Sequence, residues 1–246
     1  MGLIGEKETD YTGRVTSTTI TKTGAVVNVE AEVGPFGMVF YTVTFGQAVD
    51  AEGEKGTFAA RTRAFLSDGG VMSLTVTGTW CKREHHKWEQ KGIGLSAEGQ
   101  RYFVVEELEM ATRSTRGTIY VLDDDERVMR AIGEKIADYT GEVTSATMTA
   151  AGSVLNAEGT SGAYFGRFGY TATFGPPVDV SGETGPLAGR VQDFRPDGSV
   201  VSQVVTGVWR TSGTHQWEVK AINVGADGGR FFFVETWDLP LGLLTG

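Results

Sequence analysis

Apolar and polar residues alternate along most of this chain, in segments spaced about 10 to 15 residues apart. Alternation of this kind is typical of antiparallel strands, because successive side chains of a strand point to opposite faces. Asp68-Gly69 and Asp197-Gly198 are tight-hairpin signals, since glycine tolerates the positive φ of such turns. In the first half of the chain the pattern predicts eight strands, within YTGRVTSTTIT, AVVNVEAEV, MVFYTVTFG, GTFAARTRAFL, VMSLTVTGTW, HKWEQKGIGL, RYFVVEELEM and GTIYVLD.

The chain contains two copies of one unit. EKETDYTGRVTS from Glu6 matches EKIADYTGEVTS from Glu134, and YTVTFGQAVDAEGEKG from Tyr41 matches YTATFGPPVDVSGETG from Tyr170. The second match lies at an offset of 129 residues (170 minus 41), which then holds without a gap. Solenoid and propeller repeats run to roughly 20 to 50 residues, so each copy is expected to be a domain of its own.

These copies predict three parts of the chain. Residues 1–123 form a first β-barrel and residues 137–246 form a second. Residues 124–136 connect them through a short helix, because the acidic run that ends at Glu126 suits a helix N-terminus. The predicted fold is therefore all-β, with two tandem antiparallel eight-stranded barrels related by internal duplication.

The sequence leaves open how the second barrel closes. Eight antiparallel strands in about 125 residues are enough to close a barrel that holds side chains or one small ligand. The second copy stops at Gly246, which matches Gly117, so it has no counterpart of TIYVLD. Either the chain is cut short, or the second barrel lacks its last strand and is completed in another way.

Composition and charge narrow the class of protein. The net charge of −9 is spread along the chain, and no cluster of Lys or Arg forms a stripe for nucleic acid. Cys81 is the single cysteine, and no apolar run approaches the roughly 20 residues that span a bilayer. We expect a cytoplasmic protein without membrane or nucleic-acid partners. Its two copies are expected to pack as a pseudo-dimer, with further homo-oligomerisation left open.

A short phrase with histidine and tryptophan occurs in both copies. HKWEQK in the first copy returns as HQWEVK in the second, although the chain has only three histidines and five tryptophans. Along a strand, His86 and Trp88 share one face with Gln90, and His215 and Trp217 do the same. The two-residue period therefore predicts an imidazole and an indole inside each barrel.

A glutamate interrupts the apolar face of the seventh strand in each copy. A buried carboxylate is costly unless it is paired or protonated, and an arginine on the fourth strand is the expected partner. Such a carboxyl is either a tuned acid or base that faces a ligand, or half of an ion pair that fixes the barrel register. The candidate catalytic groups are Glu106, Glu235, His86, His215, Arg61 and Arg190.

Aromatic residues lie on the same inward faces. They either fill the core of a small barrel or line a pocket for a flat apolar ligand. The candidates for substrate binding are Tyr41, Phe45, Trp80, Trp88, Tyr170, Phe174, Trp209, Trp217 and Trp237.

Metal and cofactor chemistry find little support in the sequence. His85 and His86 are adjacent on the predicted strand and so point to opposite sides, whereas zinc needs three or four converging ligands. The glycines form no phosphate-binding fingerprint, because they follow no strand that leads into a helix. We therefore expect no metal and no cofactor.

The predicted architecture resembles the calycin-like barrels, which include lipocalin-like and allene oxide cyclase-like proteins. Lipocalins carry a Gly-x-Trp motif near their first strand. Gly78-Thr79-Trp80 and Gly207-Val208-Trp209 end the fifth strand here, so that motif does not carry over. The resemblance implies small apolar ligands and, in some branches, cyclisation or isomerisation inside the barrel.

Three functions fit these patterns. The first is a cofactor-independent isomerase, cyclase or lyase that acts on a small aromatic or polyketide-like molecule in the barrel. The second is a carrier of a similar hydrophobic molecule, and the third is a structural pair of filled barrels. Cavity volume separates the third from the others, because pockets below roughly 300 Å³ favour filled cores.

Overall fold

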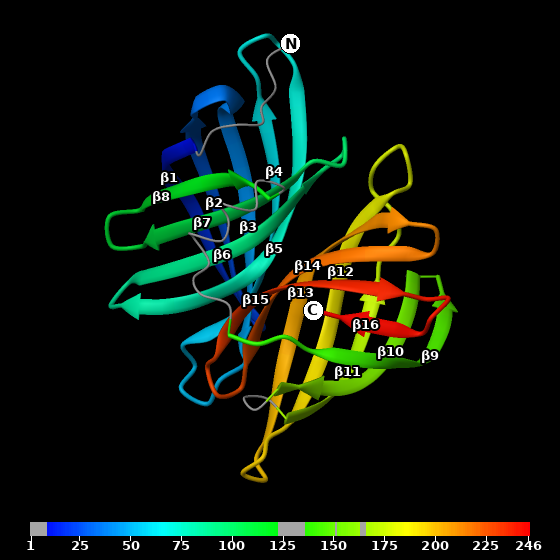
Figure 1. The fold of residues 1–246 in the computed structure, drawn as a ribbon. Helices are drawn as coiled ribbons and strands as arrows, with labels where there is room; N and C mark the ends of the chain where they lie inside the picture. The colour runs from blue at the N-terminus through cyan, green and yellow to red at the C-terminus, as the bar shows by residue number, and fades with distance from the viewer. Residues whose placement is uncertain (1–8, 123–135, 151, 163–165) are drawn as a thin grey trace. The chain divides into compact units, whose positions relative to one another are not determined.

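A computed structural model describes residues 9–122, 136–150, 152–162 and 166–246. The chain divides into two compact units, Met1–Gly133 and Glu134–Gly246, which Figure 1 colours from blue to green and from green to red. The helix expected within residues 124–136 lies outside the described residues, apart from Ile136, which belongs to no helix or strand. Pseudo-dimer packing of the two copies stays a prediction.

The first unit is a closed barrel of eight antiparallel strands. Each strand pairs with its neighbour in the sequence, and β8 returns to pair with β1. A short 3-10 helix, η1 (Gly34–Phe36), joins the second and third strands. The strands are β1 (Thr9–Thr21), β2 (Gly24–Val33), β3 (Gly37–Ala48), β4 (Lys55–Phe65), β5 (Val71–Glu84), β6 (Lys87–Ser96), β7 (Arg101–Glu109) and β8 (Ser114–Val121).

The second unit is also a closed barrel of eight antiparallel strands, in the same order. Its last strand is very short and corresponds to the first residues of β8. The strands are β9 (Thr140–Thr149), β10 (Gly152–Ser161), β11 (Gly166–Phe174), β12 (Thr184–Phe194), β13 (Val200–Gly213), β14 (Gln216–Gly225), β15 (Arg230–Asp238) and β16 (Leu243–Thr245).

Closure of the second barrel rests on β16. This strand pairs with the end of β15 on one side and with the start of β9 on the other. The backbone adds two further bonds, because Tyr139 N donates to Gly246 O at 2.8 Å and Gly246 N donates to Tyr139 O at 3.0 Å. A three-residue strand therefore completes the barrel without a counterpart of TIYVLD.

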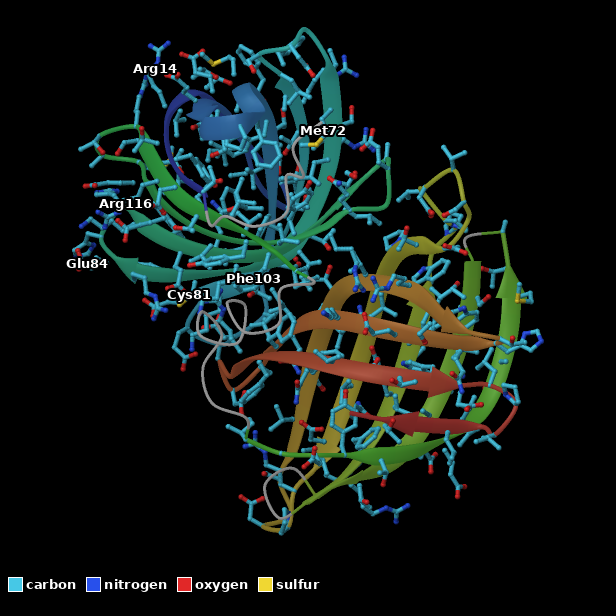
Figure 2. The ribbon with its side chains drawn as sticks, turned by 45° about the horizontal axis from the view of Figure 1, so that its top comes forward. Arg14, Met72, Cys81, Glu84, Phe103 and Arg116 are labelled. Atoms are coloured by element: carbon cyan, nitrogen blue, oxygen red, sulfur yellow. The ribbon has the colours of Figure 1, made fainter. Side chains whose placement is uncertain are left out.

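Alternation along each strand separates the inside of the barrel from its surface. In β5, Met72, Leu74 and Val76 are buried while the residues between them are exposed. Charged side chains such as Arg14, Glu84 and Arg116 project outward from the first barrel (Figure 2). No helix in the described part of the chain is long and apolar enough to cross a membrane.

Aromatic rings fill one end of each barrel. In the first, the ring of Phe45 packs against Phe58 and Trp80, each with 6.4 Å between centroids. In the second, Phe174 packs against Trp217 at 4.9 Å, and Trp217 lies 6.0 Å from Trp209. These rings come from the ends of β3, β5, β11 and β13 and from the starts of β4 and β14, so the space left inside lies toward the opposite end.

Candidate functional site

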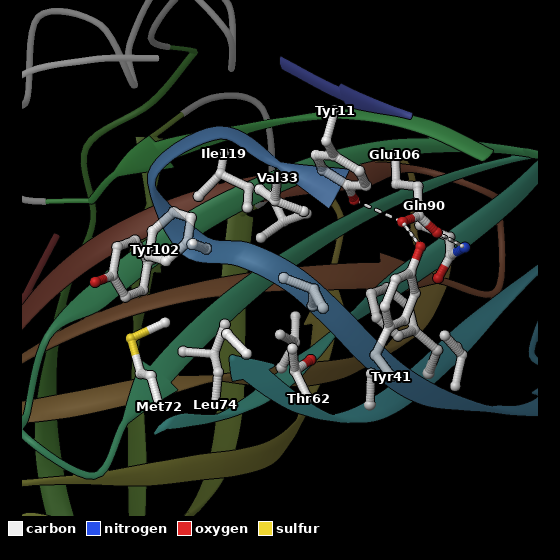
Figure 3. A pocket seen from close by; sticks show the side chains of 18 residues that line it. Tyr11, Val33, Tyr41, Thr62, Met72, Leu74, Gln90, Tyr102, Glu106 and Ile119 are labelled. Carbon is white, nitrogen blue, oxygen red and sulfur yellow. Dashed lines mark hydrogen bonds between the residues drawn. The ribbon is translucent and has the colours of Figure 1, made fainter. Parts of the chain in front are cut away.

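A buried carboxyl lies inside the first barrel. Glu106 on β7 is 5% exposed. Its Oε2 atom accepts the hydroxyls of Tyr11 at 2.6 Å and Tyr41 at 2.5 Å, and its Oε1 atom accepts the amide of Gln90 at 2.9 Å (Figure 3). The prediction that Glu106 faces the interior is confirmed, and its partners are two phenols and an amide.

Strand register and one glycine bring these groups together. Gln90 on β6 is directly opposite Glu106, which is in turn opposite Gly117 on β8. Gly117 is opposite Tyr11 on β1. A Cβ on Gly117 would lie 2.6 Å from the Tyr11 hydroxyl oxygen, so only glycine lets the ring reach across β8 to the carboxylate. The cluster therefore forms only because β8 pairs with β1 and closes the barrel.

The second barrel repeats the carboxyl with different donors. Glu235 on β15 is 2% exposed, and it accepts Tyr139 Oη at 2.7 Å and Trp237 Nε1 at 2.8 Å. The Tyr170 hydroxyl is buried beside Glu235 and helps to favour the ionised carboxyl, although it makes no well-aligned hydrogen bond among the described residues. Val219 replaces the Gln90 of the first barrel, so this carboxyl lacks the amide donor.

Burial changes the ionisation of both carboxyls. It raises the pKa of Glu106, while the hydrogen bonds from Tyr11 and Tyr41 oppose that rise by favouring the ionised form. Burial raises the pKa of Glu235 to about 7. Burial and the nearby glutamate charge raise the pKa of Tyr139 well above its usual value, so this phenol stays a donor. At neutral pH, Glu235 is therefore populated both as an acid and as a base.

Each carboxyl borders a cavity. The first cavity has a volume of about 70 Å³ and the second about 110 Å³. Both are smaller than the roughly 300 Å³ typical of ligand pockets, and smaller than a cavity of about 150 Å³ that holds benzene. This size counts against enclosing a whole polyketide-like molecule and favours largely filled cores. Figure 3 shows the Glu106 cluster at one end of the first cavity and Tyr102 with Met72 at the other.

The two cavities differ in their walls. Around the first carboxyl cluster the side chains are mostly aliphatic, with Val33, Val39, Ala64, Met72, Leu74 and Ile119 among them. The second wall contains four further polar side chains, Ser161, Asp193, Gln203 and Asn223, and the rings of Phe168, Phe231 and Phe233.

The predicted arginine partners lie on the wrong face. Arg61 on β4 and Arg190 on β12 are exposed on the outer surface. The prediction grouped them with Phe65 and Phe194, which are themselves 47% and 48% exposed. The inner face of β4 instead carries buried apolar residues such as Phe58. The prediction of an arginine–glutamate pair inside each barrel is therefore wrong.

The predicted position of the histidines is also wrong. His86 and His215 are exposed in hairpin turns, with φ of 64° and 59°. The strands that follow begin one residue later, so the two-residue alternation does not extend back to these histidines. The His86 turn also follows the end of β5, whereas Met72, which lines the first cavity, lies at the start of that strand.

Most of the aromatic residues that were predicted to bind a substrate lie away from the cavities. Tyr41 and Tyr170 line them. The others pack in the aromatic ends of the barrels and are absent from the cavity walls, although one of them bonds to Glu235. They are Phe45, Trp80, Trp88, Phe174, Trp209, Trp217 and Trp237.

Sequence reasoning missed the tyrosine donors Tyr11 and Tyr139. The signal was present, because the phrase DYTG opens both copies at these positions. Alternation within one strand does not show that β1 lies across β8 from β7, so the contact with glutamate was not predictable from it.

No group of three or more His, Cys, Asp or Glu side chains that could hold a metal occurs among the described residues. The carboxyls of the two clusters can gain and lose protons, and their phenol, amide and indole neighbours donate hydrogen bonds to them. Comparison with family models, with curated proteins and with solved structures finds no match, so the two clusters are interpreted from their own geometry.

Proposed function

We propose that the barrels bind a small, mostly apolar molecule and that Glu106 and Glu235 act on it as general acids and bases. The reaction class is a cofactor-independent isomerisation, cyclisation or elimination. The observation that supports this best is Glu235, a buried carboxyl beside a cavity with a pKa of about 7. A general acid or base is most effective when its pKa lies near the working pH. The resemblance of the sequence pattern to calycin-like barrels would imply such a ligand.

The geometry suggests how the groups would share the work. The ionised Glu235 would take a proton from a carbon or oxygen of the ligand and return it to another atom, so that an isomerisation balances without a co-reactant. The Tyr170 hydroxyl has no other hydrogen-bond partner among the described residues and would donate to an oxygen that gains negative charge. Arg61, His86 and their counterparts have no part in this proposal, because they lie outside the cavities.

Cavity size limits the ligand. A cavity of about 150 Å³ accepts benzene, so volumes of about 70 and 110 Å³ suit about three to five non-hydrogen atoms. The substrate is therefore a small molecule, or a larger one that inserts only a small group beside the carboxyl.

A carrier without chemistry is the second candidate, and the first barrel favours it. Glu106 already accepts three hydrogen bonds, from Tyr11, Tyr41 and Gln90. A carboxylate held in this way has less capacity to accept a substrate proton, while its mostly aliphatic cavity still suits a hydrophobic ligand.

The test begins with the small molecules that copurify with the protein. They would be extracted, identified by mass spectrometry and incubated with fresh protein in deuterated water. We expect rearrangement or deuterium uptake that falls by about 10²-fold or more in the variant E235Q, which keeps the shape of the side chain but cannot exchange a proton. The exposed variant R190Q is the matched control. A ligand that returns unchanged favours the carrier, and absence of any binding overturns both functions.

A further inference from the structure

Three polar side chains form a chain of hydrogen bonds inside the second barrel. Asp193 on β12, Gln203 on β13 and Asn223 on β14 lie on neighbouring strands, and all three are buried. Asn223 Nδ2 donates to Gln203 Oε1, and Gln203 Nε2 donates to Asp193 Oδ2. The backbone N–H of Phe231 fixes the far end by donating to Asn223 Oδ1 at 3.0 Å.

This chain of bonds has a direction, because each amide donates toward Asp193. A carboxylate has about four acceptor positions, and Gln203 is the one hydrogen-bond donor to Asp193 among the described residues. Asp193 borders the cavity of about 110 Å³ together with Glu235. Burial raises the pKa of Asp193, while the charge of the nearby Arg195, which is bonded to Asp227 at 2.5 Å, opposes that rise. The wall is therefore negatively charged when both of its carboxyls are ionised.

Aromatic rings complete the wall of this cavity. Tyr139, Phe168, Tyr170 and Phe233 line it. The negative faces of such rings attract organic cations, and a carboxylate accepts the N–H groups of an ammonium. The buried hydroxyl of Tyr170, without a hydrogen-bond partner in the described chain, provides one further polar contact for a ligand. Carboxylates and rings around one small cavity are suited to an alkylammonium ion.

The first barrel shows that the fold does not need this arrangement. At an offset of 129, the positions of Asp193, Gln203 and Asn223 are taken by Ala64, Leu74 and Gly94. The first barrel closes with the same strand order and these smaller or apolar side chains. The polar chain is therefore specific to the second cavity.

We infer that the second barrel binds a small primary ammonium ion, with its N–H groups on Asp193 and its alkyl part against the rings, whereas the first barrel does not. This inference rests on the proposed function only in taking the second cavity as a ligand site. It concerns binding, so it holds or fails independently of turnover.

The experiment is a titration of the full chain with n-propylammonium chloride, followed by ¹H–¹⁵N NMR. The uncharged 1-propanol is the probe of matched size, and sodium chloride corrects for ionic strength. A hydrogen bond to a charged group is stronger than one between neutral groups, so propylammonium should bind about tenfold or more tightly than propanol. The shifts should be confined to residues around Asp193, Gln203 and Glu235.

Two variants make the test specific. D193N keeps the shape of the side chain and should weaken propylammonium binding by about tenfold or more. The triple variant D193A/Q203L/N223G carries the side chains that the first barrel already accommodates, so it should fold. It should no longer bind propylammonium, which keeps the inference testable if D193N fails to fold. Equal binding of propanol, unchanged binding by D193N, or shifts centred on Glu106 would overturn the inference. Ammonium binding without any turnover would leave it intact and count against catalysis alone.

Discussion

The two barrels share a carboxyl cluster but differ in what surrounds it. Both place a buried glutamate against a tyrosine that reaches across a glycine, Gly117 in one and Gly246 in the other. Glu106 is held by three side-chain donors inside a mostly aliphatic cavity. Glu235 is held by two, beside a cavity with a second carboxyl. Both copies therefore retain the buried glutamate and its tyrosine. The side chains around this pair differ, and for this reason we expect the two barrels to bind different ligands.

Stability against pH should separate the barrels most strongly. The pKa of Glu235 rises from about 4.5 to about 7 on folding, so between these values the folded chain holds more protons than the unfolded chain. Stability should therefore be highest below this window and fall by up to about 3 kcal/mol as the pH rises through it. Urea unfolding on either side of the window would measure this. E235Q should remove most of the fall and E106Q less, and equal pH slopes in wild type and E235Q would contradict the comparison.

Removal of the shared tyrosine should cost more in the second barrel. Y11F leaves Glu106 with Tyr41 and Gln90, whereas Y139F leaves Glu235 with the indole of Trp237 and the less well aligned Tyr170 hydroxyl. Loss of a donor to a buried charged group costs about 1–3 kcal/mol, and we expect Y139F near the upper end and Y11F near the lower. Denaturant midpoints measured above neutral pH would show the difference. A larger loss in Y11F would mean that the remaining donors do not compensate.

The amide of Gln90 should account for part of the difference in ionisation. Q90V gives the first barrel the side chain that the second barrel has at Val219. Because the Gln90 amide favours the ionised carboxyl, its removal should raise the pKa of Glu106 further. A ¹³C NMR titration of the side-chain carboxyl would measure this. An unchanged pKa would assign the difference to burial and the tyrosines.

The smallest effect is expected at the hairpin histidines. His86 and His215 have positive φ, where glycine avoids a cost of about 1 kcal/mol. H86G and H215G should therefore leave turnover unchanged and raise stability by up to about 1 kcal/mol. Thermal unfolding and the deuterium assay would check both statements. Loss of turnover in either variant would restore the histidines to the site.

The sequence predicted the architecture because its signal is local and repeated. Alternation placed eight strands in the first copy, and duplication extended the pattern to the second. It also placed Glu106 and Glu235 inside, since each lies between inward residues of a long strand. Closure of the second barrel by β16 was left open, because a three-residue strand has no periodicity to detect.

The errors in the site have two physical causes. Arg61 was assigned inward because it shares a face with Phe65, but Phe65 is itself exposed at the end of β4, so that face is the outer one. His86 was assigned to a strand that starts one residue later, and a turn has no alternation. The polar chain of Asp193, Gln203 and Asn223 was missed because its members lie on three strands, and only the fold shows that they meet.

The bond between Trp237 and Glu235 has an optical consequence. The indole N–H donates to the carboxyl at 2.8 Å, so the electronic environment of the ring changes when that carboxyl gains or loses a proton. Leu108 occupies the matching position in the first barrel. The tryptophan emission of the native protein should therefore contain a component that follows the ionisation of the second barrel alone. The chain has a built-in spectroscopic label for one of its two carboxyls, which can be followed without any chemical modification.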